Sequence, residues 1–197
     1  MNAQLIPNLK TAADLVRGVQ DHLELLVPAL LEIVNPRRAA AGRVQLEPVG
    51  TWQVVPDLDA IAAAALPAIA IQAPSVRAVP VRSGAGKLDA TWDLSVGIFD
   101  RGVDHLDTQD RVETWAAIIR AAGLLAGSLG GLISKLSWQG EAYALLPDRA
   151  QARTMAGAEV MFEITAPDAI DLEGLRQLVA PDPIVTATES AIEPTAH

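Results

Sequence analysis

The sequence contains no cysteine, only 4% aromatic residues and only three lysines. The absence of cysteine excludes disulfide frameworks, thiolate nucleophiles and cysteine-based zinc sites. Acidic residues outnumber basic residues by 24 to 15, which gives a formal net charge of −9. A chain of this charge is poorly suited to gripping nucleic-acid phosphates, so we do not expect a DNA- or RNA-binding protein.

Long apolar runs are also missing. The longest uncharged apolar run, residues 60–71, spans about a dozen residues and contains Pro67, whereas a bilayer crossing needs roughly 20 apolar residues. The first residues lack the basic and apolar regions of a signal peptide. We therefore expect a soluble protein that is made in the cytoplasm and has no membrane partner.

The 197 residues suffice for one sizeable domain with a normal core. We expect a single α+β domain over residues 1–180, with a small, mostly antiparallel sheet of about four strands and helices packed on one face. Residues 36–66 are expected to form an irregular insertion, because prolines and glycines punctuate them. Residues 181–197 lack periodicity and are expected to form a flexible C-terminal tail.

Apolar residues recur every three or four positions over residues 9–34, which predicts an amphipathic helix. Pro28 should kink or divide this helix, and Asn35-Pro36 should close it. The apolar stripe fits an ordinary packing helix, or a helix that docks on a neighbouring subunit. A second helix is predicted over residues 108–126, with Asp107 as its N-cap.

Strict alternation of apolar and polar residues over 88–98 predicts a half-buried antiparallel strand. Residues 158–164 alternate in the same way, and Pro167 should end that strand. Weaker patterns predict further short strands at residues 44–46, 52–55, 68–71, 134–138 and 143–145. Short helices are expected from Asp57 or Asp59 through Ala65, and over residues 172–179.

Two stretches superficially resemble ligand sites. Residues 83–87 resemble a phosphate-binding loop, but they lack the first glycine and the final Ser or Thr, and a strand follows instead of a helix. His105 lies among four aspartates whose spacing does not match a calcium loop. We interpret the first stretch as a hairpin turn and the aspartates as helix-capping residues, so no catalytic, cofactor-binding or metal site is predicted.

Two pairs of carboxylates lie along the alternating strands, Asp89 with Asp93 and Glu159 with Glu163. Four residues along a strand span roughly 13 Å, which exceeds the roughly 5 to 10 Å that separates the carboxyl groups of glycosidases. The outer faces of both strands carry no lysine or arginine. These faces fit either a solvated surface or a surface that must not bind a polyanion.

The chain resembles the tail terminator proteins of long-tailed bacteriophages, particularly those of actinobacterial hosts. The resemblance extends over about residues 9–167 and is one of order and texture. It is carried by residues 57–75, 91–96, 107–112, 138–143, 149–153 and 158–163.

This resemblance implies a structural protein with no reaction and no cofactor. It implies a homo-hexameric ring in the virion, at the head–tail interface, that is assembled in the host cytoplasm. Such a ring caps the tail tube, stops its elongation and contacts the head's connector or stopper protein. DNA passes through its lumen without specific binding, and acidic walls would repel phosphates over a Debye length of about 8 to 10 Å. We therefore expect Asp89, Asp93, Glu159 and Glu163 to include lumen-facing residues.

Two alternatives stay open from the sequence. The first is another head–tail joining protein, such as a connector, stopper or tail-completion protein, because these are also small, acidic and ring-forming. The second is a small acidic enzyme or ligand-binding domain, whose signature would be a pocket of convergent polar groups.

Overall fold

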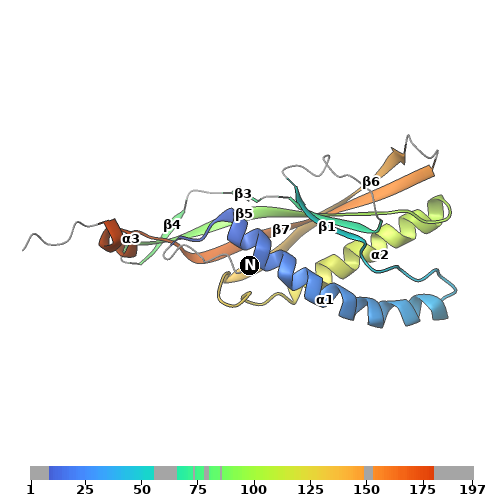
Figure 1. Cartoon of the computed structure of the whole chain (residues 1–197), viewed down its shortest axis with the longest axis horizontal. Coiled ribbons are helices and arrows are strands. Elements are labelled where there is room, and N and C mark those ends of the chain that lie inside the picture. Colours follow the sequence, from blue (N-terminus) through green and yellow to red (C-terminus); the bar gives the residue numbers. More distant parts are fainter. Residues whose placement is uncertain are drawn as a thin grey trace, which may run out of the picture.

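A mixed β-sheet lies at the centre of the fold, and two long helices pack against one of its faces (Figure 1). The structure, a computed structural model, describes residues 9–55, 66–72, 74–77, 80–84, 86–148 and 153–179. Its elements are α1 (Ala12–Ala40), β1 (Thr51–Val55), β2 (Ala68–Gln72), β3 (Ser75–Val76), β4 (Val81–Gly84), β5 (Lys87–Asp100), α2 (His105–Leu124), β6 (Lys135–Asp148), β7 (Arg153–Asp171) and α3 (Leu172–Val179).

The strands follow the spatial order β1-β2-β5-β7-β6, and β3 and β4 also pair with β5. β1 runs parallel to β2, whereas all other strand pairs within the described residues are antiparallel. The expected α+β class is confirmed, but the sheet formed by the described residues has seven strands instead of about four, and it is mixed. Residues 76–86 fit either a loop or a weak strand in the sequence, because strands as short as β3 and β4, with two and four residues, do not show a clear period.

β5 and β7 are adjacent inner strands of the sheet. The two alternating patterns in the sequence are confirmed as these strands. The register places Leu94 opposite Phe162 and Val96 opposite Val160, so apolar side chains meet on the face that the helices cover. The two pieces predicted at 134–138 and 143–145 are one strand, β6, interrupted by a register shift between Trp138 and Gly140.

Pro167 does not end its strand, because β7 continues to Asp171. The pairing of β7 with β5 shifts between Leu88 and Ala90, close to this proline. Asp168 adopts a positive φ of 47°, and its backbone N–H donates to Asp89 Oδ1 at 2.8 Å. This irregularity accommodates the missing proline N–H, and the strand resumes beyond it.

α1 begins with a capping box between Thr11 and Asp14 and continues for 29 residues. Of the two predicted effects of Pro28, a kink or a division, the structure contradicts the division, and the prediction that Asn35-Pro36 closes the helix is wrong, because both prolines lie inside α1 at exposed positions. The helix continues because its buried stripe continues and because the Asn35 amide exchanges two hydrogen bonds with the Leu46 backbone. Tertiary packing thus outweighs the local cost of each proline.

α2 packs against α1 and against β5, β6 and β7, with Trp115, Ile119 and Ala122 fully buried. Its N-cap is Asp104, whose side chain accepts a hydrogen bond from the Asp107 N–H, so the prediction of Asp107 as the cap is wrong by three residues. Asp107 instead accepts a hydrogen bond from the Val103 N–H. The predicted capping role of this acidic cluster is confirmed for Asp104.

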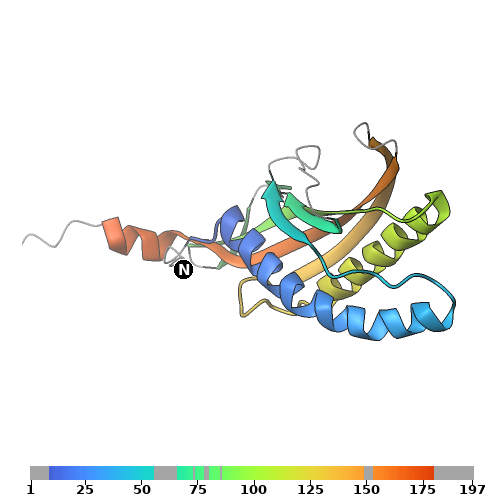
Figure 2. The ribbon, with the colours of Figure 1, turned by 45° about the vertical axis from the view of Figure 1, so that its right-hand side comes forward.

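The strand-like piece at 44–46 is irregular, whereas those at 52–55 and 68–71 are confirmed as β1 and β2. The helix predicted at 172–179 is confirmed as α3, which lies at one end of the long axis (Figure 2). The helix predicted at 57–65 and the tail at 181–197 lie outside the described residues. Within the described ranges, no helix is long and apolar enough to cross a membrane.

Candidate functional site

The structure brings two of the four predicted acidic residues directly together. Asp93 on β5 and Glu163 on β7 are cross-strand partners on the face of the sheet opposite α1 and α2. Arg77, which follows β3, lies against both: its Nη1 is 2.5 Å from Glu163 Oε2 and 3.5 Å from Asp93 Oδ1. The two carboxylates therefore share one guanidinium.

The other two acidic residues do not join this pair. Asp89, on β5, accepts a hydrogen bond from the Asp168 N–H in the irregular part of β7. Glu159 lies opposite Gly97 on β5 and Ala142 on β6, four residues along β7 from Glu163. The four carboxylates thus extend along the sheet and do not converge on one point.

The face of the sheet opposite α1 and α2 carries both acidic and basic side chains. Neither β5 over residues 88–98 nor β7 over 158–164 has a basic residue, but neighbouring strands supply Arg77 and Lys135. Lys135 pairs with Thr165 in register, which places it on the same face as Glu163. The pairing register of strands that are far apart in the chain cannot be read from the sequence. The acidic residues were therefore predicted, whereas the basic residues Arg77 and Lys135 beside them were not.

A further ion pair, between Lys87 and Asp168, lies at the start of β5 and has a structural role. Lys87 Nζ lies 3.0 Å from Asp168 Oδ2, and this hydrogen bond and charge raise the pKa of Lys87. Gly84 pairs with Lys87, which confirms that β4 and β5 form a hairpin where the sequence resembles a phosphate loop.

A second surface, which we call the aromatic rim, lies where β6 passes the outer side of α2. It consists of Arg120, Trp138, Glu141 and Tyr143. The Arg120 guanidinium lies 5.0 Å from the Trp138 ring centroid and 2.7 Å from Glu141 Oε1. The Tyr143 hydroxyl donates to Glu141 Oε2 at 2.5 Å. Trp138 and Tyr143 stay 43% and 51% exposed, so the rim presents fixed aromatic rings to solvent.

A shallow hollow of about 170 Å³ adjoins the rim, between α2 and the β6–β7 pair. Small residues form part of its wall, and Tyr143, Gln109 and Glu113 surround them. Its size suits one apolar side chain, since a dry cavity of about 150 Å³ holds a benzene ring. Exposed Trp, Tyr and Arg beside such a hollow are typical of protein-binding surfaces.

Tyr143 provides a direct test of the rim geometry, because it is the only tyrosine in the chain. Partial burial and the hydrogen bond to Glu141 raise the pKa of Tyr143 to about 12. A pKa raised in the folded state means that Tyr143 stabilises the fold at pH values below about 10, and that this contribution is lost as the pH rises toward 12. Absorbance titration at the tyrosinate band should give a midpoint near 12 in the folded protein and near 10 in urea.

In Glu141→Gln the folded midpoint should fall toward 10, since the carboxylate no longer opposes the phenolate. Glu113→Gln is the matched control, because Glu113 acts on Tyr143 only through a weaker charge interaction. Equal midpoints for the folded and unfolded wild-type protein would contradict the rim geometry.

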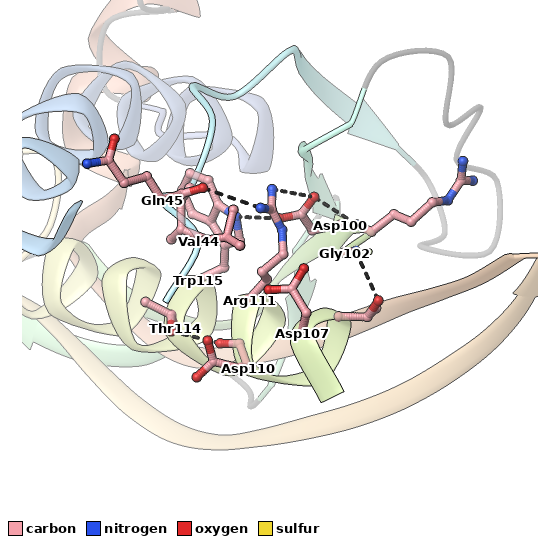
Figure 3. A network of polar contacts seen from close by, with 12 residues as sticks. Val44, Gln45, Asp100, Gly102, Asp107, Asp110, Arg111, Thr114 and Trp115 are labelled. Carbon is pink, nitrogen blue, oxygen red and sulfur yellow. Dashed lines mark hydrogen bonds and ion pairs between the residues drawn. The ribbon is translucent and has the colours of Figure 1, made fainter. Parts of the chain in front are cut away.

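A buried polar network joins β5, α2 and the chain after α1 (Figure 3). Asp100 is 1% exposed and Arg111 4% exposed, and Arg111 Nε donates to Asp100 Oδ2 at 2.9 Å. Trp115 Nε1 donates to the same oxygen at 3.0 Å, and Arg111 Nη1 reaches the Gln45 carbonyl at 3.3 Å. The Arg101 N–H donates to the other carboxylate oxygen. Each charge is paired and enclosed, so the network stabilises the fold and does not form a reactive site.

A second ion-pair cluster fixes the end of α1 against α2. Buried Arg38 lies 2.7 Å from Asp110 Oδ2 and donates to the Val44 carbonyl and to Thr114. Arg43 contacts the other oxygen of Asp110. Among the described residues, no group of His, Asp or Glu side chains has the arrangement of a metal site.

No protein-family model matches the sequence, and no curated protein sequence shows significant similarity to it.

Proposed function

We propose that the chain is a structural virion protein, the tail terminator of a long-tailed bacteriophage. In this proposal six copies form a ring that caps the tail tube, stops its elongation and joins the tail to the connector or stopper of the head. The resemblance of residues 9–167 to the sequences of tail terminator proteins supports the proposal, and the α+β fold is compatible with it.

The observation that carries the proposal is the aromatic rim on a sheet edge. β6 is a 14-residue strand whose only strand neighbour among the described residues is β7. An exposed edge of this length promotes contact with other chains, and Trp138, Tyr143 and Arg120 are of the residue types that dominate binding energy at interfaces. Such a surface suits an assembly subunit.

The lumen hypothesis for Asp89, Asp93, Glu159 and Glu163 is retained in a narrower form. Arg77 offsets part of the charge of Asp93 and Glu163. Asp89 accepts a hydrogen bond from the backbone N–H of Asp168. Glu159 has no ion-pair partner among the described residues and is therefore the best candidate for repelling passing DNA. The hypothesis fails if the assembled ring places all four residues on its outer wall.

Light scattering of the purified chain, alone and mixed with tail tubes of the same phage, tests the proposal. We expect a closed-ring mass, either alone or only with tubes, and negative-stain images should show density at tube ends. A monomer that ignores tubes would refute it. Binding to the head connector without capping tube ends would instead favour another head–tail joining protein.

Trp138→Ser provides the matched variant for the same assay. Loss of a central aromatic contact of about 2 kcal/mol would weaken tube or subunit binding roughly 30-fold. Leu25→Ser is the control, because Leu25 is an exposed apolar residue on α1, away from the rim. Equal effects of the two variants would remove the rim from the proposal.

A further inference from the structure

The outer side of α1 carries a row of exposed side chains, which we call the outer ridge. It consists of Asp21, Leu25, Ala29, Ile33 and Arg37, which follow one another at intervals of four residues. Leu25 is 72% exposed and Ile33 is 53% exposed. Side chains four residues apart form a continuous ridge on the surface of a helix, and such ridges are the units by which helices pack together.

The fold itself does not use the outer ridge. α1 packs against the core through another stripe, which includes Leu23, Val27 and Leu31. In both overall views the second half of α1 lies along the lower edge of the molecule (Figures 1 and 2). The ridge is therefore accessible to another molecule.

The end of α2 adds apolar surface beside the ridge. His22 Nε2 lies 2.9 Å from the Ala122 carbonyl oxygen, which places the end of α2 next to the Asp21 end of the ridge. Leu124 and Leu125, at this end of α2, are 57% and 63% exposed. Exposed apolar side chains from two helices that lie close together are typical of a contact surface.

The charges at the two ends of the ridge have opposite signs. Asp21 lies eight residues before Ala29, and Arg37 lies eight residues after it. Both are exposed, and neither has an ion-pair partner among the residues that the structure describes. Ala29 has a small side chain, which lets two helices approach closely at the middle of the ridge. The ridge is therefore complementary to an antiparallel copy of itself.

An antiparallel pair of ridges that is centred on Ala29 matches every position. A residue that precedes Ala29 in one copy faces the residue that follows Ala29 by the same number of positions in the other. Leu25 thus faces Ile33, and Asp21 faces Arg37. Each of these contacts occurs twice, because the pair has a two-fold axis.

Other arrangements of the two helices bring like charges together. A shift of four residues sets Arg37 against Arg17 of the other copy, and a parallel pair sets Asp21 against Asp21. In the antiparallel pair that is centred on residue 29, Glu24 and Glu32 meet no carboxylate, since they face the apolar positions 34 and 26. The charges on α1 therefore select one orientation and one register.

We propose that two copies of the chain form a symmetric dimer through the antiparallel contact of their outer ridges. The contact is isologous, so it closes on two copies and does not by itself build a ring of six. The dimer is thus a state of the free chain that goes beyond the proposed function, and it uses a surface other than the aromatic rim. Because the contact consists mainly of one helix from each copy, we expect it to dissociate at about 10–100 µM.

Reversing the charges of the ridge tests the proposal. In sedimentation equilibrium at low salt, we expect Asp21→Lys or Arg37→Glu to weaken the dimer about ten-fold, since two attractive ion pairs become two repulsive contacts. The double variant Asp21→Lys, Arg37→Glu should dimerise like the wild type. Arg17→Glu is the matched control, because it changes the net charge as Arg37→Glu does, at an exposed position of α1 that faces no charge in the dimer.

A single cysteine reports the two-fold axis directly, because the natural chain has none. Residue 29 faces itself across the axis, so Ala29→Cys should give a disulfide-linked homodimer under mild oxidation. Ala39→Cys is the control, because it is also exposed on α1 but the two copies of residue 39 lie about 30 Å apart along the pair at 1.5 Å per residue. We expect at least ten-fold less product from it.

Three results would overturn the dimer. The first is a wild-type chain that stays monomeric up to about 1 mM, far above the expected dissociation constant. The second is a double charge variant that dimerises as weakly as the single variants. The third is an equal yield of linked product from Ala29→Cys and Ala39→Cys, which would show random collision.

Two variants separate the dimer from the proposed function. Leu25→Ser should weaken the dimer and leave tube binding unchanged, whereas Trp138→Ser should weaken tube binding and leave the dimer unchanged. If tube ends are capped by a chain that is monomeric when free, the dimer is refuted and the terminator proposal stands. If the dimer forms but no tube end is capped, the dimer stands and the terminator proposal is refuted. A closed ring that forms from the free chain and is unchanged by Asp21→Lys would also refute the dimer.

Discussion

Replacing Arg111 with methionine is expected to lower the free energy of unfolding by about 3–5 kcal/mol. The substitution removes the cation from Asp100, which stays buried with the donors from Trp115 and the Arg101 backbone. A buried carboxylate that loses its cation retains the cost of desolvation without the compensating attraction. Urea unfolding followed by tryptophan fluorescence measures the loss, and the m-value should stay unchanged.

Arg43→Met is the matched control for this substitution. Arg43 also contacts an aspartate, Asp110, but its side chain is 58% exposed. An exposed ion pair contributes about 0–1 kcal/mol, so this variant should unfold close to wild type. The double variant Asp100→Leu, Arg111→Met should recover part of the loss, because an apolar pair no longer leaves a buried charge. Equal losses in the Arg43 and Arg111 variants would contradict the burial of the network.

Gly123→Val is the second substitution with a large expected effect, a loss of about 3 kcal/mol in the free energy of unfolding. A Cβ at Gly123 would lie 2.6 Å from the ring of Phe162, a buried residue of β7 that packs against α2. Neither ring nor helix can move without disturbing the packing of the sheet against α2. Thermal unfolding should show the loss as a lower Tm.

Phe162→Leu provides the test of mechanism for this steric effect. The smaller side chain should reduce the clash, so the double variant should lose less stability than the sum of the single losses. Gly84→Val is the control, since no described atom lies within 4 Å of a Cβ at that strand position. Additive losses from Gly123→Val and Phe162→Leu would show that the two positions are not in contact.

The sequence predicted the elements whose periodicity is long and uninterrupted. The alternation over 88–98 and the helical stripe over 9–34 correspond to β5 and α1, because one buried face imposes its period on the residues. Pro28 misled the prediction, since the cost of a proline is local whereas the stripe of Leu23, Val27 and Leu31 is buried along the whole helix. The helix therefore passes through it.

The candidate sites were less predictable than the fold. Asp93 and Glu163 were selected as carboxylates on outer faces, but their direct pairing depends on the register of strands 70 residues apart in the chain. Asp100 has the sequence context of a turn residue, and only the placement of Arg111 and Trp115 reveals that it is buried. The aromatic rim depends on β6 being one continuous strand beside Arg120, which its two separate patterns did not indicate.

The tie between the two ends of the described chain sets a condition on biosynthesis. Leu9 bridges to Ile170, the Lys10 N–H donates to the Ala169 carbonyl, and Lys10 Nζ donates to the Pro167 carbonyl at 2.6 Å. A ribosome adding 5–20 residues per second needs about 8 to 30 s to make the intervening chain. During this time Leu9 and Lys10 lack these partners, so the tie is one of the last contacts of the described fold that can form after the chain leaves the ribosome.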